Sequence, residues 1–371
     1  MDRTIRKVLN RYEILYLEEN MRYPEFIKDG GTIGFVAPSF GCATEPYASG
    51  FDMALDKFKA LGYKLDLGPN CREAKGIGIS NTPELCGKEL NEYYLSDNND
   101  AIISCGGGEL MCEVIPHIDF EGIKKARPKW YMGFSDNTNF TFLETTICDI
   151  ASIYGPCAGS FGMEEWHESL VDSFDVFTGK KSVVRNYKEW EINSLRDEEH
   201  PYIGFNLTEK VDMKAFVPTD TGEYQITKEP VKLEGRLIGG CLDCLLGIAG
   251  TKYDHVESFN EKYKDDGIIW FLEACDLNIM SIRRGLGQLK NTDWFKNVKG
   301  FLIGRPCAAY GQEMFGIDQY RAVTDVLSEY NVPILMDLDI GHLSPMMPIV
   351  CGSTAVVEYQ DNNFKIEYTW K

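Results

Sequence analysis

A serine on a tight turn is the first residue of the chain that could act as a nucleophile. Ser135 follows the apolar segment 130–134 and precedes Asn137, where a helix is expected to begin. A strand-to-helix turn strains the backbone and needs neighbours that tolerate left-handed geometry, which Gly133 and Asn137 provide. Such a turn exposes the serine oxygen and places the Asp136 amide at a helix N-terminus, where an oxyanion could be stabilised. The same residues also fit a serine that only caps a helix.

Three consecutive glycines, Gly106 to Gly108, follow another apolar segment, 101–105. Without Cβ atoms, their backbone can approach a ligand closely and could supply a second oxyanion amide or hold a phosphate. No Lys-Ser/Thr pair follows, so the turn is not a P-loop, and the GxGxxG pattern of dinucleotide-binding folds is absent. A plain loop remains open as an alternative.

A nucleophilic serine needs a base, and the base needs an orienting carboxylate. Glu273 ends the apolar segment 267–272, and the carboxyl ends of strands are where open α/β sheets place their sites. His342 lies in a loop with glycine and proline neighbours, a setting more typical of function than of a core. Asp276 competes with Glu273 for the carboxylate role, and each residue alone also fits a structural role.

The elements that must position these residues alternate between strand and helix in the N-terminal half. Hydrophobic periodicity predicts strands at 32–38, 63–67, 101–105 and 129–134, and helices at 47–61, 83–95 and 137–148. This alternation predicts a doubly wound parallel sheet, whose ligand lies beyond the carboxyl ends of its strands. The candidate residues each follow a predicted strand, so they could converge at one sheet edge or domain interface.

The second half of the chain is expected to form another domain after a polar, charged stretch at 163–230. Its pattern predicts helices at 239–249, 278–290 and 315–329, strands at 267–273, 300–304 and 332–337, and antiparallel strands from 353 onward. We therefore expect an N-terminal domain over 22–178, a linker with an inserted loop over 179–230, and a mixed α/β C-terminal domain with a β-rich end over 231–371. Residues 1–21 fit either an N-terminal helix or a leader.

Charge and cysteine content narrow the classes of function. The 371 residues include 38 basic and 57 acidic side chains, for a net charge of −19, which disfavours binding to nucleic acid or to an anionic membrane surface. No apolar run approaches the roughly 18 residues that a membrane span needs. The twelve cysteines often lie in apolar segments, and no signal-peptide pattern opens the chain, so we expect buried thiols in a reducing cytoplasm.

One pair of cysteines, Cys241 and Cys244, has CxxC spacing. A zinc site would need a second ligand pair, and the five histidines are scattered along the chain. We therefore expect no metal cofactor.

Taken together, these residues resemble the serine peptidase family that includes LD-carboxypeptidases and microcin C immunity peptidases. The resemblance covers about residues 30–371 and depends on the order and spacing of several motifs. These motifs are Gly34-Phe35-Val36-Ala37-Pro38-Ser39, Gly106-Gly107-Gly108, Gly133-Phe134-Ser135-Asp136-Asn137-Thr138, Leu237-Ile238-Gly239-Gly240-Cys241-Leu242 with Gly250-Thr251, Leu272-Glu273 and Gly341-His342.

The resemblance implies a Ser-Glu-His triad divided between two domains. A flavodoxin-like N-terminal domain would carry the nucleophile, Ser135, and the C-terminal domain would carry Glu273 and His342. The implied oxyanion hole uses the amide of Asp136 and that of a glycine in the Gly-rich turn, for which we favour Gly107 over Gly106. No metal or organic cofactor is implied, and a homodimer is usual.

Two departures from the family pattern bear on the substrate pocket. Gly108 stands where an aromatic residue is often found, and Cys241 stands where asparagine is common. Neither position belongs to the implied triad.

The resemblance predicts a cytoplasmic serine hydrolase that cleaves an amide bond in a small peptide conjugate. The immunity-type subgroup, which acts on peptidyl-nucleotide substrates, is favoured because Trp166 and Trp190 could stack on a base, although both also fit hydrophobic packing. Trp190 and, in the glycine turn, Gly106 are the candidate substrate contacts. One alternative is an LD-carboxypeptidase that releases D-alanine from murein tetrapeptides. An alternative of a different class is a non-catalytic module that binds a nucleotide or a sugar.

Overall fold

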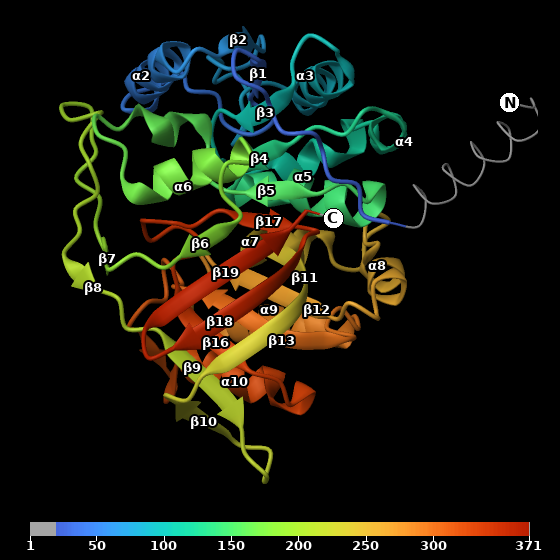
Figure 1. Cartoon of the computed structure of the whole chain (residues 1–371), viewed down its shortest axis with the longest axis vertical. Helices are drawn as coiled ribbons and strands as arrows, with labels where there is room; N and C mark the ends of the chain where they lie inside the picture. The colour runs from blue at the N-terminus through green and yellow to red at the C-terminus, as the bar shows by residue number, and fades with distance from the viewer. Residues whose placement is uncertain (1–19, 371) are drawn as a thin grey trace, which may run out of the picture.

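The computed structural model describes residues 20–370, and their N-terminal part forms a six-stranded sheet (Figure 1). Five of its strands are parallel and follow the order β2-β1-β3-β4-β5. They are β1 (Thr32–Val36), β2 (Lys64–Leu67), β3 (Ala101–Ser104), β4 (Tyr131–Gly133) and β5 (Ser152–Tyr154). This is the strand order of flavodoxin-like sheets, which confirms the fold class predicted for this half.

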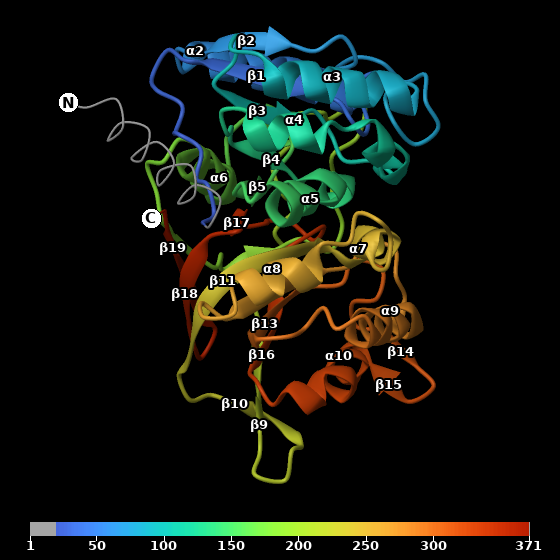
Figure 2. The ribbon, with the colours of Figure 1, turned by 90° about the vertical axis from the view of Figure 1, so that its right-hand side faces the viewer.

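Helices cover both faces of this sheet, which explains why strands such as β3 are buried along their whole length. One face carries α2 (Tyr47–Ala60) and α6 (Glu168–Phe177), and the other carries α3 (Pro83–Leu95), α4 (Phe120–Lys125) and α5 (Thr138–Cys148) (Figures 1 and 2). Ten of the eleven α5 residues are buried, because this helix lies between its own sheet and strand β11 of the second sheet. The helix that follows Ser135 is therefore held from both sides.

The C-terminal part forms a nine-stranded mixed sheet in the order β10-β9-β16-β13-β12-β11-β18-β19-β6. Its parallel centre is made of β11 (Val231–Cys241), β12 (Ile268–Glu273), β13 (Val298–Gly304) and β16 (Ile334–Leu338). Its antiparallel flanks are β6 (Val183–Arg185), β9 (Lys214–Pro218), β10 (Tyr224–Thr227), β18 (Thr354–Gln360) and β19 (Asn363–Thr369). The predicted mixed α/β domain with a β-rich end is confirmed.

The remaining elements are short or pack on the second sheet. The second half also contains α7 (Leu242–Ile248), α8 (Val256–Lys262), α9 (Ile279–Asn291) and α10 (Gln319–Leu327), and α9 contacts both α7 and α10 (Figure 2). The 3₁₀ turns are η1 (Met111–Glu113), η2 (Ile115–His117), η3 (Ser135–Asn137), η4 (Ala158–Gly162) and η5 (Ser328–Tyr330). Within residues 20–370, no helix is both long enough and apolar enough to cross a bilayer.

Three predicted elements differ from the structure. Part of the expected linker, 179–230, forms β6, β9 and β10 of the second sheet and a small pair, β7 (Glu189–Trp190) with β8 (Glu209–Lys210). The helix expected from 239 starts at Leu242, because β11 continues through Gly239, where a Cβ would lie 1.7 Å from the carbonyl oxygen of Phe271. The helix expected from 315 starts at Gln319, after a hairpin of β14 (Glu313–Met314) and β15 (Ile317–Asp318).

The two halves of the chain are interleaved as well as stacked. Strand β17 (Ile349–Cys351), from the C-terminal half, pairs antiparallel with β5 and completes the first sheet (Figure 1). The predicted division at 178 and 231 stays a prediction. Most of the segment 1–21 lies outside the described residues.

Candidate active site

Ser135, His342 and Glu273 form one hydrogen-bonded chain. Nε2 of His342 lies 2.8 Å from Oγ of Ser135, and Nδ1 of His342 lies 2.9 Å from Oε2 of Glu273. Ser135 follows β4, Glu273 ends β12, and His342 lies in the loop after β16, so strand ends from both sheets meet here. This is the arrangement of nucleophile, base and orienting carboxylate that hydrolases with a triad use.

The backbone at Ser135 has the geometry expected of a nucleophile elbow. Its φ of +61° lies in the left-handed region, which is uncommon for a residue with a side chain. The Ser135 amide donates to the hydroxyl of Tyr154 at 3.1 Å. The strained turn is thus held by a hydrogen bond from the neighbouring strand β5, and it presents Oγ to His342.

The glycine turn predicted to hold an oxyanion amide lies against Ser135. A Cβ built on Gly107 would lie 3.1 Å from Cβ and 3.3 Å from Oγ of Ser135. The Gly106 carbonyl accepts hydrogen bonds from Nδ2 of Asn137 at 2.8 Å and from Oγ of Ser104 at 3.1 Å. The Gly106 carbonyl is therefore engaged within the protein. Because a trans peptide directs its C=O and N–H to opposite sides, these two hydrogen bonds also fix the direction of the Gly107 amide.

The carboxylate of Asp136 ties the surrounding loops to the nucleophile turn. It accepts hydrogen bonds from Oγ of Ser39 at 2.5 Å and from the amide of Met111 at 2.8 Å, and Nδ2 of Asn139 donates to its other oxygen at 2.9 Å. Burial outweighs these hydrogen bonds and raises the pKa of Asp136 to about 6. The side chain is thus a structural tie between the loops after β1 and β3, which leaves the amide as the group placed for an oxyanion.

Tyr154 is a residue of the site that sequence reasoning missed. Its buried hydroxyl donates to Oε1 of Glu273 at 2.6 Å and accepts from the Ser135 amide. One hydroxyl thus joins Ser135 to Glu273 across the boundary between the sheets. Tyr154 ends β5, a strand of only three residues that the hydrophobic pattern did not predict, so the strand-end criterion that selected Glu273 could not select it.

Burial and charge act in opposite directions on the two titratable partners. Burial alone would lower the pKa of His342, but the charge and hydrogen bond of Glu273 outweigh it and raise this pKa to about 9. Burial alone would raise the pKa of Glu273, but His342 and then Tyr154 hold it below its usual value. In the resting protein the two groups therefore favour an imidazolium paired with a carboxylate.

Close backbone approach is needed where the His342 loop meets Glu273. Gly341 has a φ of +101°, and a Cβ there would lie 2.5 Å from Oε2 of Glu273. Only glycine fits this position without moving the carboxylate. A second contact docks the halves of the site, because the amide of Cys241 donates to Oγ1 of Thr138 at 3.0 Å.

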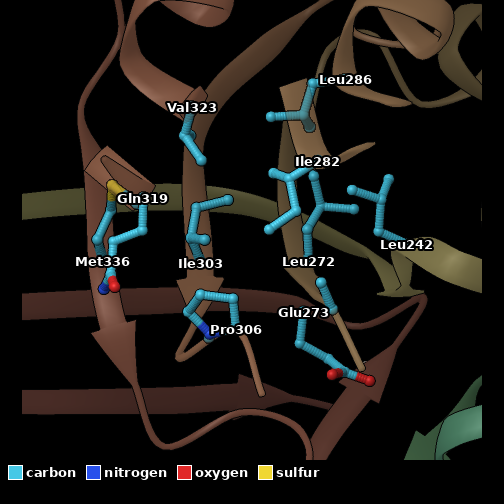
Figure 3. A pocket seen from close by; sticks show the side chains of 12 residues that line it. Leu242, Leu272, Glu273, Ile282, Leu286, Ile303, Pro306, Gln319, Val323 and Met336 are labelled. Carbon is cyan, nitrogen blue, oxygen red and sulfur yellow. The ribbon is translucent and has the colours of Figure 1, made fainter. Parts of the chain in front are cut away.

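A small apolar cavity lies behind Glu273 in the second sheet (Figure 3). Leu272, Ile282 and Ile303 line it, and the Glu273 carboxylate at its edge points away from them. Its volume of about 20 Å³ accommodates about one water molecule, whereas ligand pockets measure roughly 300 Å³ or more. The cavity is therefore a packing gap behind the triad and not a substrate site.

The predicted substrate contact of Trp190 needs correction. The side chain is 2% exposed, and its ring packs against Tyr310, with 4.8 Å between centroids, and against the Arg305 guanidinium at 4.8 Å. Its Nε1 donates to the carbonyl of Lys210 at 3.2 Å. Buried in this way, the indole presents no face to a nucleobase. Trp166 likewise packs among the aromatic side chains between α2 and α6.

The CxxC pair lies against Ser135. Cys241 is buried and precedes α7, and Sγ of Cys244 lies 3.6 Å from the carbonyl oxygen of Ser135. Among residues 20–370, no grouping of three or more His, Cys, Asp or Glu side chains is arranged to hold a metal ion. The two thiols are thus part of the wall of the site.

Comparisons with known proteins agree with this architecture. Residues 33–155 match the LD-carboxypeptidase N-terminal domain, and residues 234–357 match the LD-carboxypeptidase C-terminal domain. The chain is 27% identical to the microcin C7 self-immunity protein MccF of Escherichia coli, over 91% of this chain and 93% of the relative. It is 26% identical to a probable murein peptide carboxypeptidase of Bacillus subtilis, over 93% of this chain and 94% of the relative.

Solved structures share the fold at lower identity. MccF in complex with aspartyl sulfamoyl adenosine superposes with a TM-score of 0.74 at 22% identity, covering 94% of this chain and 98% of MccF. An MccF-like protein from Bacillus anthracis gives a TM-score of 0.75 at 20% identity, covering 94% of this chain and all of the other. Both domains of the chain, in the same order, are thus those of one family of enzymes. The chain belongs to the LD-carboxypeptidase and MccF family of serine peptidases.

Proposed function

We propose that this peptidase hydrolyses an amide bond in a small peptide conjugate with Ser135 as nucleophile, His342 as general base and Glu273 as the orienting carboxylate. The observation that carries the proposal is the continuous hydrogen-bonded chain from Oγ of Ser135 through both ring nitrogens of His342 to Glu273. The left-handed backbone of Ser135 supports the same assignment, because backbone strain of this kind is common at nucleophiles on sharp turns.

In the proposed reaction, Nε2 of His342 accepts the hydroxyl proton as Oγ of Ser135 attacks the substrate carbonyl. The amides of Asp136 and Gly107 donate to the oxygen that becomes negative, a contribution of about 3 kcal/mol for each donor. His342 then gives the proton to the departing amine. Water, activated by the same imidazole, releases the acyl group from Ser135.

The catalytic proposal is tested with a serine-directed fluorophosphonate probe. We expect covalent labelling of Ser135 in the wild type and none in Ser135→Ala, with both proteins folded by circular dichroism. Ser160→Ala, which alters a serine that follows β5, is the control and should be labelled like the wild type. Binding of ligand without labelling of Ser135 would support the non-catalytic binding module instead.

For the substrate we propose a peptidyl-nucleotide conjugate, as in the immunity-type subgroup. The support is the match to MccF over almost the whole chain and the MccF complexes with aspartyl sulfamoyl adenosine and with adenosine monophosphate. Because Trp190 is buried, its ring cannot stack on the nucleobase, and other groups must contact the base.

A second candidate substrate is a murein tetrapeptide that would lose its terminal D-alanine. The specific support is the 26% identity to the probable murein peptide carboxypeptidase. The two candidates are separated by incubating the protein with each substrate and following the products by mass spectrometry. Release of the nucleotide part alone supports the first candidate, and release of D-alanine alone supports the second. Ser135→Ala is the control for both.

A further inference from the structure

Two cysteines from distant parts of the sequence lie side by side at the edge of the candidate active site. Cys275 follows Glu273 by two residues, and Cys307 lies in the loop after the adjacent strand β13. The Cys307 amide donates to the carbonyl of Ala274 at 2.8 Å, and the Ala308 amide donates to the carbonyl of Cys275 at 2.9 Å. Each thiol is the largest influence on the pKa of the other, as expected for side chains that lie close together.

This geometry fits a disulfide. Backbones joined by hydrogen bonds run about 4.7 to 4.9 Å apart in sheets, and a disulfide spans a Cα separation of about 4.4 to 6.8 Å. The facing loops therefore need no large movement to join the two sulfur atoms. Both cysteines are free and only partly buried, whereas eight of the twelve cysteines are fully buried.

The two thiols differ in a way that suits sequential oxidation. The neighbouring Cys275 thiol and the charge of His342 outweigh burial and lower the pKa of Cys307 to about 7. The neighbouring Cys307 thiol and burial raise the pKa of Cys275. Because the thiolate is the reactive form, Cys307 is the attacking group and Cys275 is the thiol that resolves. In the CxxC pair, by contrast, the contact with Cys244 and burial raise the pKa of Cys241 well above its usual value.

We propose that Cys275 and Cys307 are a peroxide-reactive dithiol that oxidises to an intramolecular disulfide beside Glu273 and thereby slows hydrolysis. In the first step the Cys307 thiolate attacks hydrogen peroxide, so that the O–O bond breaks, hydroxide leaves and a sulfenic acid forms. In the second step Cys275 attacks the sulfenic sulfur. The S–S bond forms, and the hydroxyl group leaves with the Cys275 proton as water. The dithiol loses two electrons and the peroxide gains them.

The disulfide would act on the triad through the segment that follows Glu273. An S–S bond of about 2.05 Å is shorter than any contact between free thiols, so its formation draws Cys275 and Cys307 together. The carboxylate of Asp243 accepts hydrogen bonds from the amides of Cys275 at 3.1 Å and Asp276 at 3.0 Å, so movement here also pulls on α7. A shift of about 1 Å in a positioning group can cost roughly 100-fold in rate. This consequence depends on the proposed triad, whereas the disulfide itself does not.

Peptide mapping by mass spectrometry tests the disulfide on the full chain. After hydrogen peroxide treatment of the wild type, we expect a Cys275–Cys307 crosslink that dithiothreitol reverses. Cys275→Ser should accumulate a sulfenic acid on Cys307 that dimedone traps, and Cys307→Ser should give neither product. Cys112→Ser removes an exposed thiol that does not belong to this pair and should still form the crosslink. A crosslink between Cys241 and Cys244 in its place, or no crosslink, would overturn the proposal, and the wild-type result does not depend on how any variant folds.

Labelling of Ser135 by the fluorophosphonate probe tests the consequence for catalysis. We expect labelling to slow at least tenfold after peroxide treatment, to recover with dithiothreitol, and to stay unchanged by peroxide in Cys307→Ser. Equal labelling of crosslinked and reduced protein would contradict the effect on hydrolysis. Absence of labelling in the reduced protein would instead contradict the proposed function, and the crosslink would still be read from the peptide map.

Discussion

At the scale of single residues, removing the hydroxyl of Tyr154 tests how the proposed triad is positioned without removing any group that reacts. It is bonded to the Ser135 amide and to Glu273, and it touches no atom that reacts in the proposed mechanism. A hydrogen bond to a charged group contributes about 1.5 to 3 kcal/mol. We therefore expect Tyr154→Phe to slow the labelling of Ser135 by roughly 10-fold to 100-fold.

The matched control for this change is Tyr359→Phe, which removes a buried hydroxyl that donates to the carbonyl of Met213 at 2.9 Å, far from Ser135. Tyr359→Phe should leave the rate of Ser135 labelling unchanged, while it lowers the free energy of unfolding by about as much as Tyr154→Phe does. Because Tyr154 also helps to hold the pKa of Glu273 low, Tyr154→Phe should shift the pH profile as well as lower the rate. An unchanged profile with a lower rate would assign Tyr154 a purely structural role.

The pH dependence of Ser135 labelling follows from the pKa of His342. The imidazole must be neutral to accept the serine proton, and Glu273 raises its pKa to about 9. Labelling of the free enzyme should therefore increase with pH, with a midpoint near 9. In Glu273→Gln, burial is no longer outweighed, so the midpoint should fall below 6.5, the ordinary value. The plateau rate should also fall, on the order of 10³-fold to 10⁴-fold, as in other triads that lose their carboxylate.

The same pair makes stability depend on pH. The raised pKa of His342 contributes stability that is fully present below 6.5 and is lost as the pH rises through about 9. The lowered pKa of Glu273 contributes stability that is present above 4.5 and is lost as the pH falls through its folded value. Urea unfolding should therefore show the contribution of the Glu273–His342 pair at its maximum between pH 4.5 and 6.5. In Glu273→Gln the loss of stability above 6.5 should disappear, and burial of His342 should instead lower stability as the pH falls below 6.5. Identical pH dependence in the variant and the wild type would contradict the ion pair.

Sequence reasoning selected Ser135, Glu273 and His342 because each is a chemically capable residue at or after the end of a predicted apolar strand, and because the order of the motifs resembles a known family. It missed Tyr154, whose residue type suggests no role in a triad and whose three-residue strand was not predicted. It misjudged Trp190 because a polar stretch of sequence does not reveal that a single indole inserts between Arg305 and Tyr310. The position of a residue along a strand was thus predictable, and its neighbours in space were not.

At the scale of elements, the loop after β16 can bring His342 to Glu273 only because Gly341 has no side chain where the loop backbone lies against the Glu273 carboxylate. We expect Gly341→Ala to destabilise the fold by about 1 to 3 kcal/mol and to reduce Ser135 labelling by 100-fold or more, since the new Cβ would displace the carboxylate. Gly316→Ala is a close control, because Gly316 also has a positive φ, +75°, but has no atom within 4 Å of the added Cβ. Urea unfolding and labelling rates measure the two effects. Equal loss of labelling in both variants would contradict the steric argument.

The elements differed in how well the sequence predicted them. The parallel strands β1, β3, β4, β12, β13 and β16 were predicted because continuous apolar runs are typical of strands covered on both faces. The parallel strands β5 and β11 were not predicted. Strands β6, β9 and β10 lie toward the edges of the second sheet, where polar side chains face solvent. Their polar sequence therefore predicted a linker. The end of β11 was predicted as the start of a helix, because its two glycines allow close packing and do not mark a turn: Gly239 lies against Phe271, and Gly240 lies against Thr138.

At the scale of the whole molecule, the residues of the proposed triad come together only where the two sheets meet. Ser135 and Tyr154 come from the first sheet, and Glu273 and His342 come from the second half of the chain. The sequence indicated two α/β units but not how they interlock. Three residues of β17, too few for a periodic pattern, cross over to complete the first sheet.

This interlocking predicts that the two halves unfold together. If α5 lost the second sheet, it would expose a helix of which ten of eleven residues are buried, and the first sheet would lose its edge strand β17. In a urea titration, the loss of Ser135 labelling should coincide with the loss of helical circular dichroism in one transition. Thr138→Val removes the hydroxyl that accepts from the Cys241 amide and should shift both curves to lower urea by the same amount. Labelling that disappears well before the dichroism signal would mean that the sheets separate first, and would favour two independent domains.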